Sequence, residues 1–123
     1  NRLFHARSDD RVYFVGDLMG AISPQFGHYP KSGHVANYVG KIVARNIAER
    51  VAGKEVVARL PDNLCYMMVN GDPQEEISVK FEYEVDASGQ VNQTQIDMDV
   101  RTSDLVKEDF AWINSRFSDF LGI

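Results

Sequence analysis

Residues 33–53 read GHVANYVGKIVARNIAERVAG and carry the clearest helical pattern in the chain. Apolar residues recur there at steps of three and four, while the charged residues fall on the opposite side. Ser32 is a suitable N-cap, and Gly53 is a suitable residue for the end of the helix. The pattern predicts an amphipathic helix of about five turns, with an apolar stripe made by Val35, Val39, Ile42, Val43, Ile47 and Val51.

A short apolar run precedes this helix. Residues 11–17 read RVYFVGD, in which β-branched and aromatic residues stop at Gly16 and Asp17. Continuous apolarity without alternation favours a strand that is buried on both faces, as in a parallel sheet covered by helices. Residues 18–32 are rich in glycine and proline and are predicted to form a loop. The first part of the chain is therefore predicted to be strand, loop and long helix.

After Gly53 the pattern changes to that of an antiparallel sheet. Residues 54–62 are predicted to be a connector, and residues 64–69 a strand. Residues 77–85 alternate apolar with polar side chains, and a weaker strand near 94–100 follows, so we expect a three-stranded meander with one wet face. A closing helix is predicted from about Ser103, which can cap its first turn, with an apolar stripe made by Val106, Phe110, Ile113, Phe117 and Leu121.

The predicted fold class is α+β, with two dissimilar parts that meet near Gly53. Residues 1–53 have the pattern of an α/β piece without its full sheet, and residues 54–123 have that of a small antiparallel sheet with one helix. The apolar residues of the early strand and of the long helix would then lack complete cover. We therefore expect the isolated chain to self-associate.

The composition excludes several classes of protein. The chain has 123 residues, of which 44% are hydrophobic, and a formal net charge of −5. The apolar fraction supports a folded core, and the acidic balance without a concentrated basic face argues against nucleic-acid binding. No apolar run approaches the roughly 18–20 residues that a membrane-spanning helix needs. The first residues also lack the pattern of a secretion signal.

Cys65 is the single cysteine, which excludes an internal disulfide and a multi-cysteine zinc site. The residues alone leave three roles for Cys65: a buried small hydrophobic residue, a free nucleophile, or half of a bridge whose other half lies outside the chain. Trp112 lies beside the main apolar stripe of the last helix, so it is free to face something beyond that helix; a role as a core residue is the alternative.

Two segments next to the long helix are candidate binding elements. Asp17 follows the predicted strand at its carboxyl end, where open α/β sheets bind ligands; a role as a turn cap is the alternative. Residues 30–34, PKSGH, stand at the N-terminus of the helix, where unpaired N–H groups and the helix dipole favour negative charge. Gly33 permits close approach of a planar group, and Lys31 adds a positive charge. The histidines lack the spacing of a metal site.

Five motifs, taken in order, resemble the C-terminal part of the flavoprotein subunit of flavocytochrome c sulfide dehydrogenase, of the FAD-linked disulfide-reductase-like superfamily. They are VYFVGD at 12–17, PKSGHVAN at 30–37, NLCY at 63–66, ISV at 77–79 and AWIN at 111–114. The first motif is shared with many related flavoenzymes, sulfide:quinone reductases among them. The Cys-Tyr, Ile-Ser-Val and Trp motifs are what narrow the resemblance.

The resemblance implies that residues 1–53 are the terminal strand and long helix of a Rossmann-like FAD domain, and that residues 54–123 are a small interface domain. Cys65 would be half of a redox-active disulfide whose partner lies outside the chain, and Trp112 would lie near the flavin and the substrate pocket. FAD would be the cofactor of the full-length protein, held by Gly16, Asp17, Lys31, Ser32, Gly33 and His34.

The implied activity is the oxidation of sulfide in the periplasm, with electrons passed to a c-type cytochrome subunit. Hydrosulfide would attack the disulfide, and the released thiolate would pass two electrons to FAD. The isolated chain is expected neither to hold FAD nor to turn over substrate. Two alternatives stay open: another flavin-dependent disulfide oxidoreductase that uses quinone or nicotinamide, and a non-catalytic dimerisation or interaction domain.

Overall fold

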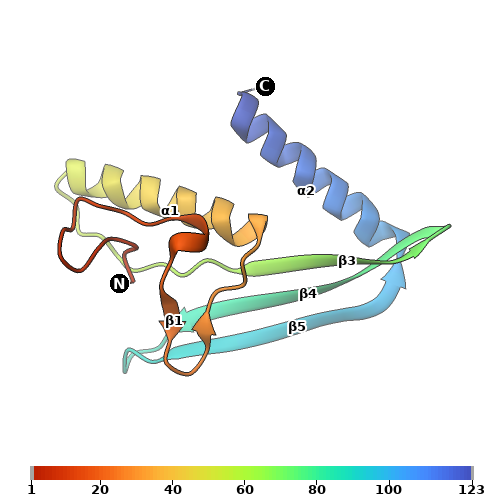
Figure 1. Cartoon of the computed structure of the whole chain (residues 1–123), viewed down its shortest axis with the longest axis horizontal. Coiled ribbons are helices and arrows are strands. Elements are labelled where there is room, and N and C mark those ends of the chain that lie inside the picture. Colours follow the sequence, from red (N-terminus) through yellow and green to blue (C-terminus); the bar gives the residue numbers. More distant parts are fainter. Residues whose placement is uncertain (1, 123) are drawn as a thin grey trace. The chain divides into compact units, whose positions relative to one another are not determined.

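The computed structural model describes residues 2–122 and confirms a mixed α+β fold (Figure 1). Strands β1 and β2 form a two-stranded antiparallel sheet, and three longer strands form an antiparallel sheet in the order β3-β4-β5. The elements in chain order are the 3-10 turn η1 (Gly16–Leu18), β1 (Ala21–Ser23), β2 (Gly27–His28), α1 (Gly33–Val51), β3 (Asn63–Gly71), β4 (Gln74–Val85), β5 (Val91–Thr102) and α2 (Ser103–Leu121).

The chain divides into two compact units. Within the described residues, the first unit comprises 2–63 and 81–95, and the second comprises 64–80 and 96–122. The first unit holds η1, the β1-β2 hairpin and α1, and the second holds α2. The division at Gly53 was predicted for the domains of a longer flavoprotein, and it stays a prediction.

Helix α1 confirms the predicted helix and its N-cap. The Ser32 hydroxyl accepts a hydrogen bond from the Val35 N–H at 3.2 Å. Gly53 follows the helix with φ +69°, a left-handed conformation that glycine adopts without strain. The first two thirds of the predicted stripe lie in the core of the first unit, whereas Ile47 and Val51 are exposed. The buried residues of this core are Phe4, Ile22, Tyr29, Val35, Val39, Ile42, Val43, Tyr83 and Val91.

A fully buried polar residue, Asn46, also lies on the inner side of α1. Its Nδ2 donates to the Leu3 carbonyl at 3.4 Å, and its Oδ1 accepts from Arg59 Nη1 at 3.3 Å. Arg59 also donates to both carboxylate oxygens of Glu49, at 2.9 and 3.1 Å. Because a buried amide must find partners, Asn46 fixes the segments that precede and follow α1 against the helix.

The predicted buried strand over residues 11–17 is wrong. Within this run only Tyr13 takes part in a ladder, as an isolated antiparallel bridge with His5. Val12, Phe14 and Val15 are exposed. A parallel strand needs neighbours reached through crossover connections, and the sheets within residues 2–122 are antiparallel. An apolar run alone therefore does not produce the strand.

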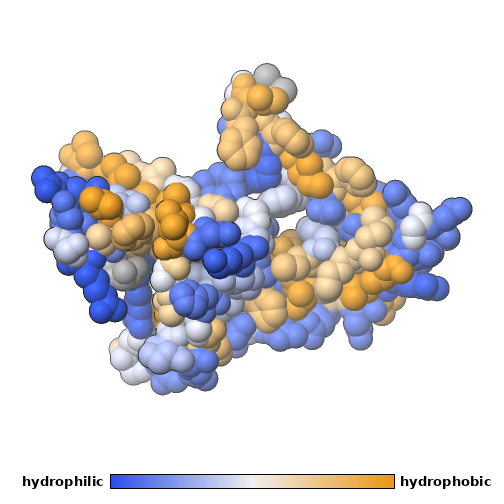
Figure 2. Space-filling model, viewed as in Figure 1, coloured by the Kyte–Doolittle hydropathy of each residue, from blue (hydrophilic) through white to orange (hydrophobic). Residues whose placement is uncertain are grey.

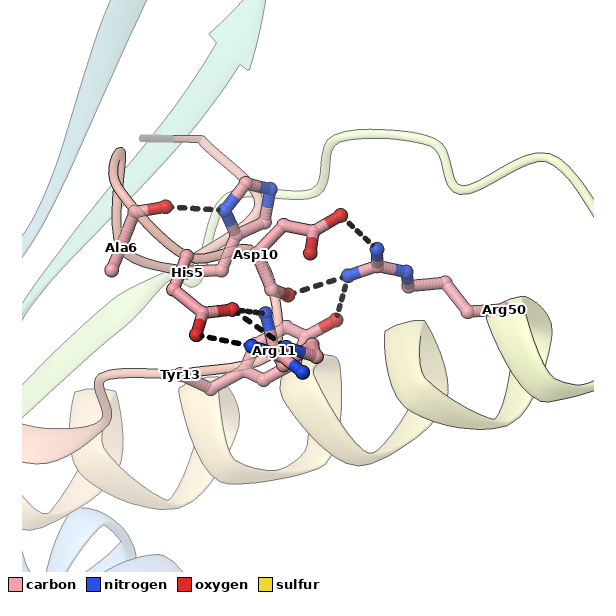
Figure 3. Close-up of polar contacts among 7 residues, drawn as sticks. His5, Ala6, Asp10, Arg11, Tyr13 and Arg50 are labelled. Atoms are coloured by element: carbon pink, nitrogen blue, oxygen red, sulfur yellow. Dashed lines mark hydrogen bonds and ion pairs between the residues drawn. The ribbon is translucent and has the colours of Figure 1, made fainter.

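Polar contacts hold this segment along α1 instead (Figure 3). Arg50, near the end of the helix, donates to the Asp10 carbonyl at 2.6 Å and to the Tyr13 hydroxyl at 2.9 Å, and it pairs with the Asp10 carboxylate. Arg11 makes two bonds of 3.0 Å to the Asp9 carboxylate. Exposed pairs of this kind contribute little individually, so the segment is positioned rather than strongly stabilised.

The predicted loop over residues 18–32 contains the β1-β2 hairpin. The Ser23 hydroxyl accepts from the Phe26 N–H at 3.1 Å, and Gly27 has φ +68°. Ile22 and Tyr29 anchor the hairpin because their side chains are buried in the core of the first unit. Strands of three and two residues in a stretch rich in glycine and proline are too short to be predicted from the sequence.

The three predicted strands are confirmed. Alternation predicted that the polar side of β4 faces solvent, but part of that side is buried. Glu76 and Ser78 are only 4% and 7% exposed, whereas Met98 and Val100 on β5 are exposed. In the second unit the Tyr66 hydroxyl of β3 bonds to Glu108 of α2 at 2.8 Å. The helix therefore contacts the polar side of the sheet, which a period of two cannot predict.

Helix α2 is confirmed, but its cap is Thr102 rather than Ser103. The Thr102 hydroxyl accepts from the Asp104 N–H at 3.1 Å. Leu105 and Val106 are buried and Ile113 is half-buried, while most of the later apolar residues of the helix stay on the surface (Figure 2). These exposed residues are Phe110, Phe117, Phe120 and Leu121, which are 54% to 80% exposed. Within residues 2–122, neither helix combines the length and the apolar character needed to cross a membrane.

The position of this cap gives a direct test with a matched control. Thr102→Ala should lower the free energy of unfolding by about 1 kcal/mol, because the Asp104 N–H loses its acceptor. Ser103→Ala, one residue later and already inside the helix, should change it by less than about 0.5 kcal/mol. Urea denaturation followed by circular dichroism measures both. A larger loss for Ser103→Ala would contradict the assigned cap.

Candidate functional site

Four of the predicted cofactor-binding residues line one hollow in the first unit, at the N-terminal end of α1: Gly16, Asp17, Lys31 and Ser32. The space in this helix-end hollow that a water-sized molecule can enter is about 10 Å³. Met19, His28, Tyr29, Pro30, Val35 and Ala36 complete its lining. Two segments that sequence analysis selected separately are therefore brought to the same place.

Asp17 reaches the helix-end hollow from a tight turn rather than from the end of a strand. Gly16 has φ +60°, and its carbonyl accepts from the Met19 N–H at 3.3 Å, which closes η1. Because the main chain closes this turn, the Asp17 carboxylate is not needed as its cap. The left-handed conformation of Gly16 also explains why a side chain is disfavoured at this position.

Ser32 connects the hollow to the start of β3. Besides capping α1, its hydroxyl donates to Asn63 Oδ1 at 2.7 Å, and Asn63 is fully buried. This bond fixes the Ser32 rotamer, and with it the first turn of α1. Asn63 was quoted in the NLCY motif but was not predicted as a site residue. An asparagine at the start of an apolar strand was the signal.

Gly33 and His34 form the first turn of α1, immediately after Ser32. The His34 imidazole stacks on Tyr38, with ring centroids 5.2 Å apart and an interplanar angle of 14°. The lining of the helix-end hollow continues from Ser32 to Val35 and Ala36, on the adjacent part of the same turn. The N-terminal end of the helix dipole therefore lies at the hollow, where it favours negative charge.

The other two predicted site residues belong to the second unit. Cys65 lies on β3, is half-buried and forms no disulfide within the described residues. Trp112 lies on α2, half-buried, with the Arg116 guanidinium carbon 5.8 Å from its ring centroid. The structure thus gathers the predicted flavin-binding residues in one unit and places the predicted redox residues in the other.

A polar cluster in the second unit was not predicted from the sequence. Glu76 Oε2 is buried without a hydrogen-bond partner, and burial, assisted by the nearby Asp109, raises the pKa of the Glu76 carboxyl. Burial likewise raises the pKa of Asp109. Burial and the bond to Glu108 raise the pKa of the Tyr66 phenol. The sequence pattern does not distinguish Glu76, because polar residues recur at alternate positions along β4.

No group of three or more histidine, cysteine or carboxylate residues within 2–122 is arranged to hold a metal ion. His5 bonds through Nδ1 to the Ala6 carbonyl at 2.8 Å and packs edge-on against Tyr13. No family model, curated protein or solved structure matches the chain. The site is therefore interpreted from its own chemistry.

Proposed function

We propose that the chain is the C-terminal part of an FAD-dependent, periplasmic sulfide dehydrogenase that passes electrons to a c-type cytochrome subunit. One observation carries this proposal: Gly16 and Asp17 share a hollow with Lys31 and Ser32 at the N-terminus of α1. The ordered motifs that resemble the flavoprotein subunit support the same conclusion. A Rossmann-like FAD domain upstream is part of the proposal.

The polar groups that line the helix-end hollow match groups of FAD in their chemistry. The Asp17 carboxylate is an acceptor suited to ribityl hydroxyls, and Lys31 with the end of the α1 dipole suits the anionic side of a reduced flavin. Met19, Val35 and Ala36 supply an apolar wall. When bound, FAD supplies a centre that accepts two electrons and releases them singly.

The residues of the chain would have distinct roles in this enzyme. Lys31 would hold negative charge at the hollow, and Ser32, fixed by Asn63, would keep the helix N-terminus in place. Cys65 would form a disulfide with a cysteine outside the chain. Hydrosulfide attack would break that disulfide, form a persulfide on one cysteine and release the other as thiolate. Trp112 would shield the substrate pocket.

A non-catalytic interaction domain is the second candidate, because apolar residues on α2 and in residues 12–18 are exposed. Exposed apolar groups of this extent mark interaction surfaces in folded proteins. This candidate requires neither flavin nor a reactive Cys65. It therefore makes the opposite prediction for both.

The proposal is tested on the full-length protein. It should purify with FAD, and sulfide should bleach the visible absorbance of the flavin, whereas the 123 residues alone should retain no flavin. Asp17→Ala should lower the flavin content severalfold because a carboxylate acceptor is lost. Asp97→Ala, at an exposed position of β5, is the control. Bound flavin without bleaching would favour another flavin oxidoreductase, and absence of flavin would favour the interaction domain.

A further inference from the structure

Apolar residues recur along α2 at steps of four, three, four and three, in the order Val106, Phe110, Ile113, Phe117 and Phe120. This is the spacing of the a and d positions of a coiled coil, in which side chains of one helix fit between those of a second helix. Val106 is buried, whereas Phe110, Phe117 and Phe120 are 54%, 59% and 80% exposed and Ile113 is half-buried. We call the last four of these residues the α2 seam. The α2 seam therefore has the pattern that pairs with another helix.

The α2 seam is large enough to need a cover. Figure 2 shows apolar surface gathered along this helix. A covered aromatic side chain buries about 150–250 Å², so the exposed parts of the three phenylalanines and of the adjacent Leu121 amount to roughly 400–500 Å². Folded monomers rarely expose a continuous apolar patch of more than a few hundred Å². Two such surfaces in contact would bury on the order of 1,000 Å², which is about the lower limit for a specific interface between proteins.

The α2 seam also lies in a stretch without net charge. Residues 110–121 contain one basic and one acidic side chain, Arg116 and Asp119, which form an ion pair at 3.0 Å. The whole chain has a net charge of −5, so two copies repel each other over most of their surface. At the α2 seam this repulsion is weakest, and a strongly charged partner would find no net opposite charge there. A second, identical seam matches the first in both spacing and charge.

We propose that two copies of the chain form a dimer through their α2 seams. The same residues of both copies would then meet across a two-fold axis, as in most dimers of identical chains. Phe110, Ile113, Phe117 and Phe120 of each helix would fill the spaces between those of the other. An interface of this modest size is expected to dissociate in the micromolar range. This inference does not depend on the flavin chemistry of the proposed function.

Sedimentation velocity of the 123-residue chain, from low micromolar to nearly millimolar concentration, tests the dimer. The original chain should shift from monomer to dimer as its concentration rises. Phe117→Glu should raise the dissociation constant roughly a hundredfold or more, because a symmetric interface loses two large apolar side chains and gains two charges. Phe120→Glu, at the most exposed position of the seam, should act in the same direction. Far-UV circular dichroism checks that both variants are folded.

Three matched variants separate the α2 seam from other surfaces. Ala111→Glu adds the same charge at an exposed position of α2 beside the seam. Met98→Glu and Val12→Glu replace exposed apolar residues of β5 and of the segment before η1. All three should dimerise with nearly the original dissociation constant. If any of them weakens the dimer as much as Phe117→Glu does, the dimer does not form through the seam.

Two further results would overturn the proposal. One is an original chain that stays monomeric at every concentration. The other is an unchanged dissociation constant in both Phe117→Glu and Phe120→Glu. In either case something other than a second copy of α2 would cover the seam.

Discussion

Glu76→Gln should stabilise the chain at neutral pH by about 1 kcal/mol or more, because it removes the charge from a buried carboxyl whose Oε2 has no partner. An ionised carboxylate in this place is unfavourable, since Asp109 lies nearby and burial disfavours charge. The amide is neutral at every pH and nearly identical in shape. The gain is therefore electrostatic rather than a change in packing.

The pH dependence gives the sign of this effect. The pKa of Glu76 is raised above its ordinary value of 4.5 in the folded chain, so the folded state holds more protons than the unfolded state above that pH. The Glu76 contribution is fully present below the ordinary pKa and is lost as pH rises through the raised value. Glu76→Gln should therefore match the original chain in acid and exceed it at neutral pH.

Urea denaturation at a series of pH values measures this difference directly. Glu75→Gln is the matched control, because the neighbouring Glu75 is only half-buried and pairs with Arg101 at 3.3 Å. Exposed carboxyls with lowered pKa, such as Asp86 and Asp104, affect both chains equally and cancel in the comparison. If the free energy of unfolding depends on pH in the same way for Glu76→Gln and the original chain, ionisation of Glu76 does not destabilise the fold.

Cys65→Ala in the full-length protein should abolish the bleaching of flavin by sulfide, with a loss in rate of roughly a thousandfold or more, while FAD stays bound. The change removes the sulfur that the proposed disulfide requires, whereas the predicted flavin-binding residues lie in the other unit. Anaerobic stopped-flow absorbance measures the rate. The flavin spectrum before sulfide addition reports the cofactor content.

Met67→Ala is a suitable control for Cys65→Ala. Met67 lies two residues further along β3, so its side chain points to the same side of the strand, and it is partly exposed. In the Met67→Ala variant, sulfide should bleach the flavin at nearly the original rate. If Cys65→Ala bleaches as fast as Met67→Ala does, Cys65 has a structural role only and the disulfide mechanism is wrong.

Features that depend on local chemistry could be predicted from the sequence. Ser32 caps α1, Gly53 follows its end, and the meander of β3, β4 and β5 has the predicted order. Each depends on a few neighbouring residues and their backbone preferences. Asp17 and Lys31 were likewise selected from positions next to a turn and a helix end.

Features that depend on distant partners could not be predicted. Residues 11–17 have the composition of a buried strand, but a strand exists only with a neighbour to pair with. The burial of Glu76 could not be predicted, because alternation gives two faces and does not say which one a helix covers. The buried amides Asn46 and Asn63 form hydrogen bonds with residues far along the chain, so the spacing of apolar residues does not predict them.

Because apolar residues of α2 are exposed, the stability of the folded chain can depend on the concentration of whatever covers them. Covering one large apolar side chain gains roughly 1.5–3 kcal/mol, and Phe117, Phe120 and Leu121 are all uncovered within the described residues. If a second chain or another surface covers them, the folded form becomes more stable as the concentration of that partner rises. The stability of the chain is then set by the supply of its partner as well as by its own sequence.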